Sequence, residues 1–123
     1  MTMREGGHPP PGFSVTTRHQ DGVVVIVIRG QLDAETAQGV AIDFESAVSA
    51  DGPVVVDLCG TSFLDSSGLY SLMVLRRRLA ERERPLAVAC WPNGAVDLTF
   101  RVSGASEFFS LHATRTDAVA SVS

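Results

Sequence analysis

Two runs of aliphatic, mostly β-branched residues limit what this chain can fold into more than any other feature. Val23 to Ile28 contains only Val and Ile, and Val54 to Leu58 is interrupted only by Asp57. Such runs are typical of strands covered on both faces, as at the centre of a sheet. After each run, apolar residues recur at the three- and four-residue spacing of helices. The pattern therefore predicts strands alternating with helices around one core.

The expected elements follow this alternation, starting with a hairpin whose turn contains Asp21-Gly22. Strands are expected at 13–18, 23–28, 54–58, 86–91 and 108–111, and helices from Asp33 to about Ala50, from Asp65 or Ser66 through Leu79, from Asn93 to Gly104 and from Thr114 to Val122. Gly30 is expected to end the second strand, and 60–64 to be a connection. The predicted fold class is α/β: one domain with a mixed sheet of four to five strands, an initial β-hairpin and about four helices.

Residues 1–12 are rich in Pro and Gly and lack an apolar run, so we expect a flexible tail before a domain at 13–123. The tail resembles neither a signal peptide nor a transmembrane segment. Cys59 and Cys90 form no CxxC pair, which indicates reduced thiols. The expected location is the cytoplasm, without membrane attachment.

Composition argues against several classes of function. All ten basic residues are Arg, against fourteen acidic residues, and the net charge of −4 argues against nucleic-acid binding. Without Lys there is no phosphate-binding GxxxxGK[ST] loop, and no serine lies in a nucleophile elbow. The histidines lack metal-ligand spacing: His8, His19 and His112. The sequence therefore predicts no catalytic residue, no metal site and no cofactor, and hence no enzyme.

An arginine-rich segment follows in the second long helix, from Arg76 to Arg84. We interpret it as a solvated helix face in which Arg77 and Glu81 form an i,i+4 ion pair, rather than as a nucleic-acid patch. A role of this segment in binding a protein partner stays open.

The most informative segment is 57–69, where a strand ends and Asp65-Ser66-Ser67-Gly68 begins a helix. A helix N-terminus favours negative charge, so a phosphate on a serine there would be accommodated without disturbing the fold. A simpler interpretation is that Ser66 is only an N-cap, worth about 1 kcal/mol.

This segment resembles the STAS domain of anti-sigma factor antagonists. Asp65-Ser66-Ser67-Gly68-Leu69 after Phe63-Leu64 is similar to the family's motif, and Gly30-Gln31-Leu32-Asp33 is similar to its Gly-Glu-Leu-Asp helix start, with Gln31 in place of Glu. The strand at 54–58 and the helix segment at 116–119 match as well. The resemblance extends from about residue 13 to 122.

The resemblance implies a regulator of transcription, as in stress response or sporulation, that binds an anti-sigma factor and releases a sigma factor. The partner would be a serine kinase with a Bergerat-type ATP site, which inactivates the antagonist by phosphorylating Ser66, and a PP2C-type phosphatase would restore it. Asp65, Ser67 and Gly68 would shape the recognised loop. Asp33, in the neighbouring loop, would contact the partner, but helix capping is a sufficient explanation of Asp33 and is the preferred one. The resemblance implies no cofactor, and the expected state is a monomer or weak dimer.

Two alternatives remain. STAS domains also serve as docking subunits of lipid-transport ABC systems, but these need no phosphorylatable serine, so Ser66 favours the sigma-regulatory interpretation. A small enzyme on a related scaffold would need a concave site with perturbed titratable groups, and the sequence offers no candidate. Tyr70, a bulky residue close to the kinase-facing loop, could alter which kinase fits.

Overall fold

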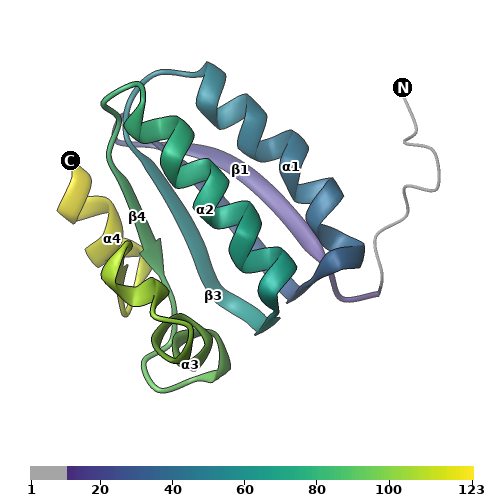
Figure 1. Ribbon diagram of the computed structural model, residues 1–123. Coiled ribbons are helices and arrows are strands. Elements are labelled where there is room, and N and C mark those ends of the chain that lie inside the picture. The colour runs from purple at the N-terminus through teal and green to yellow at the C-terminus, as the bar shows by residue number, and fades with distance from the viewer. Residues whose placement is uncertain (1–10) are drawn as a thin grey trace.

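Five strands form one mixed sheet in the order β1-β2-β3-β4-β5 (Figure 1). The computed structural model describes residues 11–123, so most of the predicted tail lies outside the described residues. The elements are β1 (Ser14–Gln20), β2 (Val23–Leu32), α1 (Ala34–Ser49), β3 (Val54–Leu64), α2 (Ser66–Ala80), β4 (Leu86–Ala89), α3 (Ala95–Val102), a short 3-10 helix η1 (Ala105–Glu107), β5 (Ser110–His112) and α4 (Arg115–Val122). The predicted α/β class, with its initial hairpin and four helices, is confirmed.

The first two strands pair antiparallel, and the others are parallel. Asp21 and Gly22 form the hairpin turn with φ angles of 53° and 79°. Two positive φ values match the primed turn that suits the twist of a hairpin. Each parallel connection then carries one helix in turn: α1, α2 or α3.

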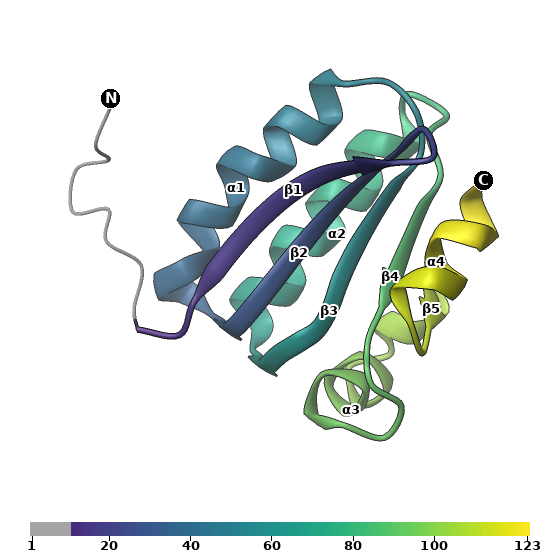
Figure 2. The same cartoon turned by 180° about the vertical axis from the view of Figure 1, so that it is seen from behind.

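The helices cover the two faces of the sheet unequally. Helices α1 and α2 lie across one face (Figure 1), and α4 packs on β3 and β4 from the other (Figure 2). The run in β2 divides between the two cores, since Val24, Ile26 and Ile28 belong to the larger cluster and Val23, Val25 and Val27 to the smaller one. Burial on both faces is why this strand contains no polar alternation.

The strands β2 and β3 are longer than predicted. Gly30 does not end β2, and the predicted connection at 60–64 is wrong, because both strands continue as a parallel pair to Leu32 and Leu64. Two register shifts accommodate the extension, and the Thr61 hydroxyl donates to the Ile28 carbonyl at 2.8 Å. Gly30 has a φ of 96°, and a Cβ there would lie 2.7 Å from the Gly12 carbonyl oxygen. Glycine here permits a close chain crossing rather than a strand end.

Two further boundaries differ from prediction. Strand β4 ends at Ala89 rather than 91, since the chain turns into the loop where Asn93 has a φ of 62°. The predicted strand at 108–111 is displaced to Ser110–His112 and preceded by η1. Phe109 packs edge-to-face on Phe100, with ring centroids 5.2 Å apart, so core packing decides the backbone path here.

The arginine segment of α2 also differs from prediction. The predicted pair of Arg77 and Glu81 is absent from the ion pairs of residues 11–123, and Arg78 instead pairs with Glu45 on α1. Arg82 and Arg84 both donate to the Val48 carbonyl, and Arg84 also donates to the Gly52 carbonyl. Much of the segment therefore attaches the end of α2 to the end of α1, where carbonyl groups attract cations.

Candidate partner-binding site

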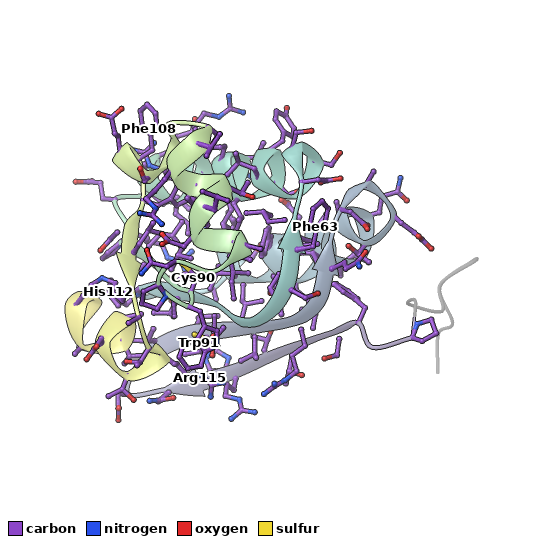
Figure 3. The ribbon with its side chains drawn as sticks, turned by 90° about the horizontal axis from the view of Figure 1, so that it is seen from below. Phe63, Cys90, Trp91, Phe108, His112 and Arg115 are labelled. Carbon is purple, nitrogen blue, oxygen red and sulfur yellow. The ribbon has the colours of Figure 1, made fainter. Side chains whose placement is uncertain are left out.

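The carboxyl ends of β2 and β3 bring the two predicted site segments together. Strand β2 leads into Asp33 and α1, while β3 leads into Asp65 and α2. The Asp65 N–H donates to the Leu32 carbonyl at 3.2 Å, which holds the two helix starts side by side. Figure 3 is a view onto this end of the molecule.

Asp65, and not Ser66, caps α2. Its carboxylate accepts a hydrogen bond of 3.0 Å from the Gly68 N–H, and its backbone is extended, as an N-cap requires. Ser66 is the first helical residue and is exposed, and its hydroxyl makes no hydrogen bond with any other residue of 11–123. The alternative that Ser66 is only a cap is therefore wrong, and its hydroxyl is accessible at a helix N-terminus.

Ser67 and Gly68 have different surroundings from Ser66. Ser67 is half-buried, and its carbonyl accepts a hydrogen bond of 3.2 Å from the Ser71 hydroxyl. Gly68 is buried, and a Cβ there would lie 2.6 Å from both the Leu32 carbonyl oxygen and Leu64 Cδ1. Glycine at 68 therefore allows the start of α2 to pack directly on the end of β2.

Asp33 caps α1 in a reciprocal capping box. Its carboxylate accepts from the N–H groups of Glu35 and Thr36 at 3.0 and 3.2 Å, and the Thr36 hydroxyl accepts from the Asp33 N–H at 3.0 Å. The predicted capping role is confirmed. Contact of Asp33 with a partner stays a prediction.

A cavity of about 410 Å³ lies beside this edge, between the segment 11–13 that precedes β1, the ends of β2 and β3, and the start of α1. Its charged lining residues are Asp33 and Glu35, and the other lining residues are neutral, including Gln31 and Ser62. Carboxylates repel phosphate groups, so this cavity does not suit a nucleotide.

Three exposed apolar residues at this edge were not among the predicted site residues. We call them the apolar rim: Phe63 at the end of β3, and Leu98 and Val102 on α3. Figure 3 shows Phe63 near the end of β3, apart from the exposed Trp91 and Phe108. The four-residue spacing of Leu98 and Val102 is visible in the sequence, but only the structure shows that this helix face stays uncovered.

The two cysteines and Asp57 lie in or beside the two cores rather than at the candidate site. Both cysteines are free, as predicted, and burial raises the pKa of Cys59 to about 12 and that of Cys90 to about 11. Asp57 is 4% exposed and binds Arg115 Nε at 2.7 Å. Residues 11–123 contain no group of His, Cys, Asp and Glu that could hold a metal ion, and no helix among them is long and apolar enough to cross a membrane.

Comparison with known proteins gives a consistent result. The STAS domain family matches residues 14–118. An anti-sigma factor antagonist from Mycobacterium paratuberculosis is 26% identical over 93% of this chain and 97% of its own, with a TM-score of 0.85. The comparison with curated proteins returned no significant match.

Two structures of the anti-sigma factor antagonist SpoIIAA share the fold. The unphosphorylated form has a TM-score of 0.70 and 23% identity, covering 87% of this chain and 92% of its own. The phosphorylated form, from Bacillus, has a TM-score of 0.66 and 22% identity, covering 90% and 99%.

Sheet, helices and exposed helix start together define a small α/β domain whose helix α2 begins at an accessible serine. The chain belongs to the STAS domain family. The STAS anti-sigma factor antagonists that it resembles are regulatory proteins and not enzymes.

Proposed function

We propose that this chain is an anti-sigma factor antagonist that is controlled by phosphorylation of Ser66. In its unphosphorylated form it binds an anti-sigma factor that is also a serine kinase, and this releases a sigma factor. Phosphorylation of Ser66 ends the interaction, and a PP2C-type phosphatase restores it. The kinase supplies the nucleotide, so the chain itself needs no cofactor.

The accessibility of Ser66 carries this proposal. Asp65 provides the helix cap, so the Ser66 hydroxyl is exposed without a hydrogen bond to any other described residue. A kinase can reach such a hydroxyl without unfolding the helix. Modification of Ser67 would be harder, because Ser67 is half-buried.

The position of Ser66 at the start of a helix also suits a phosphoserine. Ser66 opens a helix of 15 residues, whose N-terminal amide groups and dipole favour an anion. A phosphate adds a charge of about −1.5 to −2 at one surface point while the fold persists. The existence of SpoIIAA structures in both the unphosphorylated and phosphorylated forms supports a switch of this kind in the family.

Phosphosite mapping and binding measurements test the proposal together. We expect mass spectrometry of the chain from its own cells to find a condition-dependent phosphate on Ser66. Ser66→Ala should hold the anti-sigma factor constitutively, and Ser66→Asp should weaken binding at least tenfold. Ser49→Asp is the matched control, because Ser49 is an exposed serine at the opposite end of α1.

Two results would contradict the proposal. One is unchanged binding by Ser66→Asp, and the other is the absence of phosphate on Ser66 under every growth condition. In that case the alternative of a docking subunit in a lipid-transport ABC system would take precedence.

A further inference from the structure

Helix α3 is apolar on two opposite faces. Val96 and Phe100 point into the larger core and are 4% and 0% exposed, whereas Leu98 and Val102 are 55% and 78% exposed. A surface helix normally has one apolar face and one polar face, and apolar character all around indicates a helix that is covered on both sides. No residue of 11–123 covers the outer face of α3.

This outer face adjoins the start of α2. The Thr99 hydroxyl donates to the Leu64 carbonyl at 3.2 Å, so α3 lies against the end of β3, two residues before Ser66. Leu98 and Val102 lie on either side of Thr99 along the helix, and Phe63, 46% exposed, directly precedes Leu64. The apolar rim therefore lies at the same end of the molecule as the site of the proposed phosphorylation.

The charges of α3 identify the kind of partner that fits this face. Asp97 and Arg101 pair with each other at 3.0 Å and so neutralise one another. The apolar rim on α3 thus suits neutral, apolar side chains rather than a charged segment. The binding energy of protein interfaces concentrates in such apolar centres, from which water is excluded.

We propose that the apolar rim of Phe63, Leu98 and Val102 forms the second half of the surface that binds the anti-sigma factor, and that it packs against an apolar patch of that protein. The inference rests on the proposed function and adds to it the chemistry of the contact. It also explains how a phosphate on Ser66 acts, because a doubly charged group beside an apolar contact prevents the exclusion of water. Arg101, the basic residue of α3, is already paired with Asp97 and does not neutralise that charge.

Photo-crosslinking in the native cells tests the inference. A benzophenone amino acid is placed at 98 or 102, at 70 as a reporter of the Ser66 site, and at 42 as the control. Tyr70 lies one helical turn after Ser66, and Ile42 is an apolar residue of α1 with 50% exposure. We expect positions 70, 98 and 102 to crosslink to the same anti-sigma factor, position 42 to give none, and Ser66→Asp to abolish all three.

The outcomes separate this inference from the proposed function. Crosslinks from 70 alone, or from 98 and 102 to a second copy of this chain or to another protein, would overturn the inference and leave the function standing. Absence of crosslinks at 70, 98 and 102 would contradict both.

Binding measurements with the purified anti-sigma factor provide a second test. Leu98→Ala and Val102→Ala should each weaken binding at least tenfold, while Ile42→Ala leaves it unchanged. Circular dichroism verifies that the variants are folded. Unchanged affinity in both α3 variants, together with a loss in Ser66→Asp, would also overturn the inference.

Discussion

Gly68 shows at the scale of one residue how the site depends on close packing. A Cβ at 68 would lie 2.6 Å from the Leu32 carbonyl oxygen, which is shorter than any tolerated contact. The glycine lets α2 begin directly beside the end of β2, and this fixes where Ser66 is presented. Gly68 therefore has a structural role, in addition to its predicted part in the loop that a kinase recognises.

Gly68→Ala should therefore destabilise the fold by about 1 to 3 kcal/mol, despite the gain in helix propensity. Gly60→Ala is the control, because a Cβ at 60 would meet only the exposed Arg29 side chain, which can move. Urea denaturation of both variants measures the difference. Equal stabilities would show that the contact at Gly68 relaxes without cost.

Asp65 and Ser66 offer a second test at this scale, since only Asp65 caps the helix. Asp65→Ala should cost about 1 kcal/mol of unfolding free energy, whereas Ser66→Ala should change it by less than about 0.5 kcal/mol. Thermal melts followed by circular dichroism distinguish them. A larger loss in Ser66→Ala would mean that Ser66 has a structural role after all.

At the scale of elements, one ion pair attaches α4 to the sheet. The Asp57 carboxylate on β3 accepts from the Cys59 N–H at 2.9 Å and from Arg115 Nε at 2.7 Å. Burial by itself raises the pKa of Asp57, but these two donors outweigh it, so that the pKa lies below its ordinary value. The folded chain therefore holds Asp57 ionised with Arg115 as its partner.

Arg115→Ala should destabilise the chain by about 3 kcal/mol at pH 7, because it leaves a buried carboxylate without its cation. Arg78→Ala should cost less than about 1 kcal/mol, since both side chains of its pair with Glu45 are exposed. Denaturant titrations measure both variants. Similar losses would show that the Asp57 pair contributes no more than a surface pair.

The same pair predicts how stability depends on pH. A carboxyl group whose pKa is lower in the folded chain stabilises above its unfolded pKa of about 4, and this contribution is lost as pH falls through the folded pKa. Stability should thus decline below about pH 4, and the decline should be smaller in Arg115→Ala. An equal decline in both chains would assign the acid sensitivity to other carboxylates.

For the whole molecule, burial of the cysteines gives a test of the complete fold. Cys90 lies in the larger core and Cys59 beside the smaller one, and burial raises the pKa of both thiols. Alkylation by iodoacetamide at pH 8 should be slow in the folded chain and complete in denaturant, since the thiolate is the reactive form. Rapid alkylation of Cys90 without denaturant would indicate local opening around it.

The sequence by itself determined the α/β class, the hairpin and the helix starts at Asp33 and Thr114, because each follows from local patterns: apolar periodicity, turn residues and capping side chains. It also placed Ser66 at the start of a helix, since a strand, a short polar motif and a helix are visible in the order of residues.

Only the tertiary structure decided what depends on neighbours distant in sequence. Pairing with β3 carried β2 past Gly30, the carbonyl groups at the end of α1 drew Arg82 and Arg84, and Asp65 took the cap that Ser66 could have held. The exposed apolar face of α3 is another feature that only the tertiary structure decided, because whether an apolar helix face is covered depends on what the rest of the chain places against it.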